Sequence, residues 1–285
     1  MKINSYQITS KVDLSKMDTL YVEDHAKNKL KKTRKKISAI QDIMYAQGKY
    51  SVLICLQGMD TAGKDSLIRE VFKSFNTRGI NVHSFKQPSS LELEHDFLWR
   101  HYLALPQRGK FGIFNRTHYE NVLITRVHPE YILNENIPSI NNINQLDDAF
   151  YQNRMQHINN FEQHLNDNGT IILKFFLNIS KEEQKKRLLR RIEFEEKNWK
   201  FSAADIKERK LWKKYMLCFE DLLERTSTKY APWFVIPSDD KATSRLLVAK
   251  TILKTLQQYS DIDEPELDTD SKAKLEEYRK MLEND

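Results

Sequence analysis

The chain has 285 residues, of which 40% are hydrophobic, so it is long enough and apolar enough for one large α/β domain with an ordinary core. Its formal net charge of +6 favours a polyanionic partner, such as a phosphate polymer, a nucleic acid or an acidic membrane surface. Two cysteines, no apolar run at the start and no segment long enough to cross a membrane argue against a disulfide-stapled, secreted or membrane-embedded protein, and we expect a cytoplasmic one.

The first predicted element is a basic helix over residues 23–47, where apolar side chains recur at helical spacing. Most charge runs form a solvated surface, but here few acids are interleaved, so the helix would repel itself unless an anion neutralised it. Both a solvated face and a polyanion-binding face fit the pattern, and we favour the second. The basic residues at the front of this helix are Lys27, Lys29, Lys31, Lys32, Arg34, Lys35 and Lys36.

A phosphate-binding loop follows an apolar strand that begins at Ser51. The pattern is Gly, four residues, then Gly-Lys, except that Asp65 replaces the usual Ser or Thr. Glycines let the backbone wrap closely around an anion, the N–H groups at the start of the next helix point at it, and Lys64 adds a full positive charge. The residues of the loop are Gly58, Met59, Asp60, Thr61, Ala62, Gly63, Lys64 and Asp65.

Two carboxylates stand beside this anion site, Asp60 inside the loop and Asp65 at its end. Bare carboxylates would repel phosphate, and a divalent cation between them removes the conflict, so we predict bound Mg²⁺. Asp60 is the better candidate ligand. Asp65 has an equally good explanation as an acidic residue stabilised by the dipole at a helix N-terminus.

Two further strands are predicted, at residues 81–85 and 110–114. Loops at the carboxyl ends of parallel strands are where α/β folds bind ligands, so Lys86, just after the first of these strands, and Arg100, in the helical segment beyond it, are candidate phosphate contacts.

Asn115 ends the strand over 110–114, at the place where many phosphate-loop enzymes carry an Asp that holds magnesium. Its amide oxygen can coordinate a metal but carries no charge, and Glu120, five residues later, could restore that charge. Arg116 could pair with a structural carboxylate, but beside a phosphate loop we favour a role in stabilising charge on a transferred phosphoryl group.

The rest of the chain predicts a loop over 129–144, a buried strand over 170–177, a last strand over 233–237 and an acidic tail over 261–285. Two charged helices, together residues 181–225, precede the last strand and predict a helical lid. Arg187 and Arg191 are four residues apart and share one helix face, from which they could close over a phosphate. An ordinary salt-bridged hairpin is the alternative.

With these elements in place, the chain resembles the polyphosphate kinase 2 family over nearly its whole length. The order Asn115 then Glu120 resembles class III of that family, whose members phosphorylate nucleoside monophosphates and diphosphates. The segments that carry the resemblance are the phosphate loop 58–65, Ser84-Phe-Lys-Gln-Pro-Ser89, His95-Asp-Phe-Leu-Trp-Arg100, Phe114-Asn-Arg-Thr-His-Tyr-Glu120, Trp199-Lys-Phe-Ser202 and Ala231-Pro-Trp233.

The resemblance implies one phosphate-loop kinase domain over residues 1–285, with a thymidylate-kinase-like parallel sheet flanked by helices and a helical lid. It implies Mg²⁺, inorganic polyphosphate as donor, and AMP and ADP as acceptors, with other nucleotides possible. Asp60 and Lys64 would lie at the transferring phosphate, Arg116 would bind phosphate there, and Arg187 and Arg191 would be the lid arginines.

Two other functions fit parts of the sequence. An ATP-dependent nucleoside monophosphate kinase would use the same loop. A nucleic-acid-binding protein would explain the net charge, but the loop carboxylates would repel a phosphate backbone, so we expect neither a nucleic-acid nor a membrane partner. We also expect a homo-oligomer, for which the C-terminal tail is a candidate contact.

Overall fold

A parallel five-stranded sheet is the centre of the computed structural model, which describes residues 3–285. The strand order is β2-β3-β1-β4-β5, and the register places Leu56 of β1 and Ser84 of β2 beside Asn115 of β3. The carboxyl ends of these three strands therefore meet at one edge of the sheet. The strands are β1 (Ser51–Gln57), β2 (Ile80–Ser84), β3 (Phe111–Asn115), β4 (Thr170–Asn178) and β5 (Trp233–Pro237).

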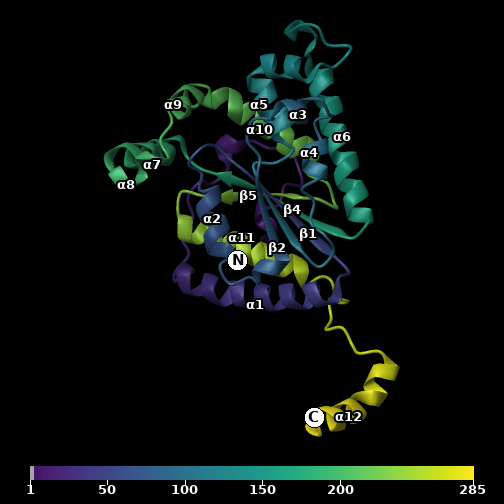
Figure 1. Cartoon of the computed structure of the whole chain (residues 1–285). Coiled ribbons are helices and arrows are strands. Elements are labelled where there is room, and N and C mark those ends of the chain that lie inside the picture. The colour runs from purple at the N-terminus through teal and green to yellow at the C-terminus, as the bar shows by residue number, and fades with distance from the viewer. Residues whose placement is uncertain (1–2) are drawn as a thin grey trace.

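Helices cover both faces of the sheet (Figure 1). One layer contains α1 (Ala26–Gln47), α2 (Lys64–Val71) and α11 (Lys241–Leu256), with α11 packed on both of the others. The other layer contains α5 (Glu120–Val127), α6 (Asp148–Asp167) and α10 (Trp212–Thr226), with α10 packed on α5 and α6. The predicted parallel sheet flanked by helices is confirmed.

Shorter elements connect these layers. Before β3 the chain forms η1 (Ile3–Tyr6), η2 (Leu14–Lys16), η3 (Thr77–Gly79), α3 (Ser90–Leu93) and α4 (Trp99–Tyr102), and after α5 it forms η4 (Pro129–Glu135) and η5 (Ile143–Gln145). The segment 129–144, expected to be a loop, is thus largely 3₁₀-helical. The elements α7 (Lys181–Glu193), α8 (Glu195–Asn198) and α9 (Ala203–Lys210) project from the body, as does α12 (Thr269–Glu283) at the end of the chain (Figure 1).

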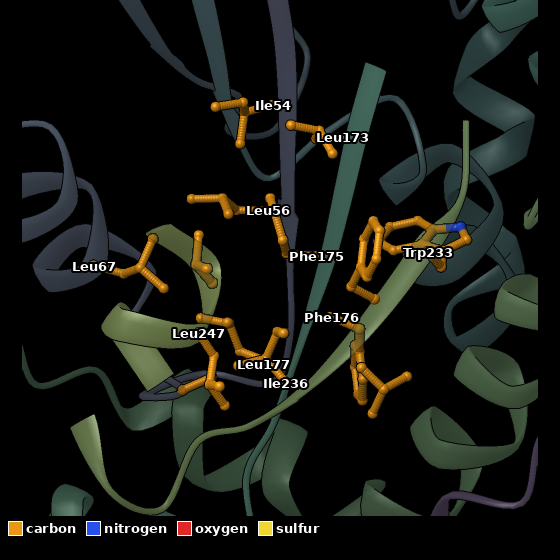
Figure 2. Close-up of a cluster of buried hydrophobic side chains, with 14 of the residues drawn as sticks. Ile54, Leu56, Leu67, Leu173, Phe175, Phe176, Leu177, Trp233, Ile236 and Leu247 are labelled. Atoms are coloured by element: carbon orange, nitrogen blue, oxygen red, sulfur yellow. The ribbon is translucent and has the colours of Figure 1, made fainter. Parts of the chain in front are cut away.

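The core lies on both sides of β1, whose residues are all buried. Figure 2 shows Leu56 of β1, Leu67 of α2 and Leu247 of α11 converging on one side of the sheet. A fully buried side chain of this size stabilises the fold by roughly 2 kcal/mol. This packing fixes α2, and with it the loop that joins α2 to β1.

The expected lid over 181–225 differs from the structure at its C-terminal end. The second of the two charged helices expected over 181–225, from Ser202 onward, is not one helix. It consists of α9 and α10, which are separated at Leu211. Apolar residues at helical spacing, including Phe219 and Leu223, bury one side of α10 against the core, so α10 belongs to the body. Within residues 3–285, no helix combines the length and apolarity needed to cross a membrane.

Candidate active site

The phosphate loop joins the carboxyl end of β1 to the start of α2, and its backbone needs its glycines. Gly58 has φ +148° and Gly63 has φ +110°, both in the region that favours glycine. A Cβ at Gly58 would lie 2.9 Å from the carbonyl oxygen of Leu177, so alanine would force the loop away from β4. Thr61 holds φ +65° without being glycine, and its buried hydroxyl oxygen has no hydrogen-bond partner within the described chain.

Lys64 folds back over this loop. Its Nζ donates to the carbonyl oxygen of Gly58 at 2.6 Å and lies 3.4 Å from that of Met59. Burial lowers the pKa of the Lys64 ammonium, and the carboxylates of Asp60 and Glu120 only partly offset that effect. The Lys64 ammonium is therefore held over the loop by the carbonyl oxygens of Gly58 and Met59. A bound anion would replace these two carbonyls as the partner of Lys64.

A cleft of about 170 Å³ opens beside the loop and brings six of the predicted site residues together: Gly58, Met59, Asp60, Lys64, Arg116 and Glu120. Arg116 Nη2 lies 3.1 Å from Asp60 Oδ1, and Arg116 has the strained backbone angle φ +59°. Burial raises the pKa of the Glu120 carboxyl, while Arg116 and Lys64 act against the rise. The cleft therefore holds cations and carboxylates at one edge of the sheet.

The rest of the lining of the cleft was not predicted. It includes the side chains Leu123, Ile124, His128, Tyr131, Glu208, Tyr215 and Phe219. The Tyr215 hydroxyl donates to Glu208 Oε2 at 2.5 Å, and His128 Nε2 contacts the same oxygen at 3.0 Å. The rings of His128 and Tyr131 stack 5.4 Å apart. The sequence predicted charged helices over 181–225, but no local signal indicated which apolar side chains of α10 would face the cleft.

Asn115 and Asp65 form a separate contact. Asn115 Nδ2 donates to Asp65 Oδ1 at 2.7 Å and to Ser84 Oγ at 3.2 Å, and neither Asn115 nor Asp65 lines the cleft. The amide oxygen of Asn115 is buried and has no hydrogen-bond partner within residues 3–285. An unpartnered oxygen of this kind is chemically suited to a hard cation.

The described residues contain no group of three or more His, Cys, Asp or Glu side chains arranged to hold a metal. Mg²⁺ in phosphoryl-transfer sites is commonly held by only one or two carboxylates, with waters and substrate phosphates completing its shell. The residues here fit that pattern better than they fit an all-protein metal cage. Two carboxylates, Asp60 and Glu120, line the cleft. The unpartnered oxygen of Asn115 belongs to the residue five positions before Glu120.

Lys86 and Arg100 lie outside the cleft. Lys86 is exposed. Arg100 pairs with Glu92, at 3.3 Å between Nε and Oε1, and its guanidinium lies 5.1 Å from the centre of the Phe85 ring. The arrangement therefore gives no support to the expectation that both residues contact phosphate. Arg100 of α4 packs instead against the ring of Phe85, which follows β2.

Arg187 was expected to be a lid arginine, and the structure places it elsewhere. It is buried at the base of α7 rather than on the projecting part. Nε donates to Glu183 at 2.8 Å, Nη1 to the carbonyls of Thr61 and Ala62 at 3.0 Å each, and Nη2 to those of Ser238 and Asp239 at 2.7 and 2.9 Å. All five guanidinium donors are used, so Arg187 has none left for a phosphate.

Arg191 does lie in the projecting segment. Its Nη1 donates to Asp205 Oδ2 and to the carbonyl oxygen of Lys200, both at 2.9 Å, which joins α7 to α9. Burial and the nearby Asp60 carboxylate raise the pKa of Asp205, although Arg191 acts against them. Asp205, at the start of α9, therefore interacts electrostatically with Asp60 of the phosphate loop.

A second link from α9 to the phosphate loop was missed by sequence reasoning. Arg209 Nη1 donates to Gln184 Oε1 at 2.8 Å, and Gln184 Nε2 donates to the carbonyl oxygen of Asp60 at 3.1 Å. The spacing of these residues gives no sign of a contact between two helices and a loop.

The basic helix α1 does not border the cleft. It packs on α11, Arg34 donates to the carbonyl oxygen of Glu70 at 3.0 Å, and Lys29 pairs with Glu23 at 2.6 Å. Its remaining lysines are exposed. A solvated face and a polyanion-binding face both remain compatible with this position.

Comparisons with known proteins agree with this geometry. The family model for polyphosphate kinase 2 matches residues 21–264. The chain is 43% identical to the "ADP-polyphosphate phosphotransferase" of Rhodopseudomonas palustris, covering 99% of both chains, and 41% identical to the "AMP/ADP-polyphosphate phosphotransferase" of Meiothermus ruber, covering 78% of each. The crystal structure of polyphosphate kinase 2 from Arthrobacter aurescens superimposes with a TM-score of 0.87 at 33% identity, covering 99% of this chain and 96% of that one.

Proposed function

Because the chain belongs to the polyphosphate kinase 2 family, we propose that it is a phosphotransferase that moves the terminal phosphoryl group of inorganic polyphosphate to AMP and ADP. The single observation that carries the proposal is the cleft in which Asp60, Lys64, Arg116 and Glu120 meet beside the phosphate loop. Both substrates are strongly anionic, and this cleft combines an anion-binding loop, which includes Lys64, with the cation of Arg116.

The reaction needs positioning and charge stabilisation rather than a covalent intermediate. A phosphate oxygen of AMP or ADP attacks the terminal phosphorus of polyphosphate, a new P–O bond forms, and the bond to the bridging oxygen breaks, so that the polymer leaves one phosphate shorter. The N–H groups of the loop bind the terminal phosphate, and Lys64 exchanges its carbonyl partners for it. Arg116 stabilises the negative charge that develops on the transferred group.

Asp60 and Glu120, which line the cleft, are the side chains that would hold Mg²⁺. Asn115 stays a candidate ligand through its unpartnered oxygen, although it does not line the cleft. When bound, the ion would supply positive charge between carboxylates and phosphates that otherwise repel each other. Without it, the Asp60 carboxylate is compensated by Arg116.

The apolar and aromatic part of the cleft lining suits the acceptor nucleotide. Leu123, Ile124 and Phe219 offer apolar surface, and Tyr131 stacks on His128 in the same lining. A nucleoside bound there would direct its phosphate toward Arg116 and Lys64, which line the same cleft. The proposed lid is α8, α9 and the end of α7, with Arg191 holding its two sides together.

An assay without ATP tests the function directly. AMP, Mg²⁺ and long-chain polyphosphate should yield ADP and ATP. Product from AMP and ATP, but none from AMP and polyphosphate, would instead establish an ATP-dependent nucleoside monophosphate kinase. Binding to DNA without any phosphoryl transfer would exclude both.

A further inference from the structure

A charged pair is buried in the core on the α6 side of the sheet. Lys174, in the middle of β4, and Glu162, on α6, are both completely inaccessible to solvent. Lys174 Nζ uses its three donors on Glu162 Oε2 at 2.6 Å, the Tyr119 hydroxyl at 2.7 Å and the carbonyl oxygen of Thr226 at 2.6 Å. Replacing such a pair by well-packed apolar residues is often neutral or stabilising, so stability alone does not explain it.

The other partners of Glu162 lead toward the cleft. Glu162 Oε1 accepts from the Tyr119 hydroxyl at 2.7 Å and contacts His118 Nε2 at 3.0 Å. The Lys174 ammonium and the His118 contact outweigh burial and hold the pKa of Glu162 below its ordinary value. A carboxylate that stays ionised is a strong acceptor for both groups.

His118 and Tyr119 lie between two of the cleft residues, Arg116 and Glu120, in the turn from β3 to α5. Arg116 adopts φ +59° in this turn, a conformation that costs free energy unless the surroundings impose it. The same turn is held from β1, because Gln57 Nε2 and the backbone N–H of Tyr119 both donate to Thr117 Oγ1 at 3.1 Å. The three residues between Arg116 and Glu120 are thus buried and held in the core, while Arg116 and Glu120 themselves line the cleft.

We propose that Glu162 and Lys174 are positioning residues for phosphoryl transfer, which hold the Arg116–Glu120 turn in its strained conformation through Tyr119 and His118. The inference rests on the proposed function, in which Arg116 and Glu120 face the transferred phosphate. The pair itself is completely buried and lines no part of the cleft.

The test compares variants of this pair with a matched control. Glu162→Gln/Lys174→Met leaves no buried charge, and Tyr119→Phe removes only the bridging hydroxyl, so at least one folded variant is expected. Glu135→Gln breaks a second largely buried pair of α6, in which the partner is Arg154, without touching the turn. Thermal unfolding, kcat, and KM for AMP and for polyphosphate are measured for each.

For Tyr119→Phe and the double variant, kcat should fall by about tenfold to a hundredfold, as displacement of reacting groups by a fraction of an ångström or more does. Both KM values should change by less than about twofold, since the loop and the apolar part of the cleft lining are untouched. Glu135→Gln should lower Tm and leave kcat unchanged. Normal kcat in folded Tyr119→Phe and double variants would overturn the inference.

A double-mutant cycle separates positioning from general destabilisation. If Tyr119 acts through Arg116, adding Tyr119→Phe to Arg116→Ala should lower kcat no further, whereas independent effects would multiply. Normal turnover in Arg116→Ala alone would contradict the role given to Arg116 in the proposed function. An impaired but measurable Arg116→Ala variant, in which Tyr119→Phe still has its full effect, would contradict only the positioning of Arg116 by Tyr119.

Discussion

Arg187 Nη1 donates a hydrogen bond of 3.0 Å to the carbonyl oxygen of Thr61, the non-glycine residue that holds φ +65° inside the phosphate loop. The same guanidinium reaches Ala62 on the loop and Ser238 and Asp239 after β5. One buried side chain therefore connects the phosphate loop to the segment that follows the edge strand β5. We therefore predict that Arg187 shapes the loop rather than binding the transferred phosphate.

Replacing Arg187 by Ala should destabilise the protein and loosen the loop together. Several buried carbonyls lose their donors, so the free energy of unfolding should fall by at least about 3 kcal/mol, measured by urea denaturation. KM for polyphosphate should rise as well. The exposed neighbour Arg190 is the control, and Arg190→Ala should change neither quantity. A large loss of kcat with wild-type stability would restore the lid role expected from the sequence.

Lys64→Ala and Arg116→Ala should each lower kcat by about a hundredfold or more, because each removes a positive charge that faces the transferred phosphoryl group. Steady-state turnover of AMP with polyphosphate measures the effect. Arg69→Ala, on the exposed side of α2, removes the same kind of charge outside the cleft and should have little effect. Turnover near that of the wild type in either cleft variant removes that residue from the mechanism.

Glu120→Gln should raise the Mg²⁺ concentration needed for half-maximal activity, because a neutral amide is a weaker ligand than a carboxylate. Titrating Mg²⁺ at fixed AMP and polyphosphate gives that concentration. Glu224→Gln makes the same change at an exposed position on α10 and serves as control. An unchanged Mg²⁺ requirement in Glu120→Gln would mean that the ion binds elsewhere.

His101 should make stability depend on pH in the mildly acidic range. Burial, with His118 and Arg100 nearby, holds its pKa well below the ordinary value of 6.5. The unfolded chain therefore binds the proton more tightly, and the free energy of unfolding should fall as the pH drops below about 6.5, by up to about 1.4 kcal/mol per pH unit. Urea denaturation between pH 7.5 and 5.5 should show a flatter profile for His101→Gln, and equal slopes would exclude His101 as the cause.

The parts of the protein that depend on local pattern could be predicted from the amino-acid sequence. The apolar run over Ser51–Gln57, the two loop glycines and the helix after Lys64 specify a strand, an anion-binding turn and a helix with almost no tertiary information. Asn115, Arg116 and Glu120 were found because the carboxyl end of a parallel strand is a predictable place for a site. These local signals also supported the family resemblance, which the comparisons confirm.

Which side chains lie next to one another could not be predicted in this way, because it depends on how the helices and strands pack. Arg187 and Arg191 carry the same charge and lie four residues apart on α7. Yet Arg187 donates to buried backbone carbonyls, whereas Arg191 joins the projecting helices α7 and α9. Tyr215 and Phe219 reach the cleft because α10 packs on α5. The pairing of Glu162 with Lys174 depends on how α6 lies over β4. Such contacts join residues far apart in the chain, and their geometry is set by packing, which no local periodicity encodes.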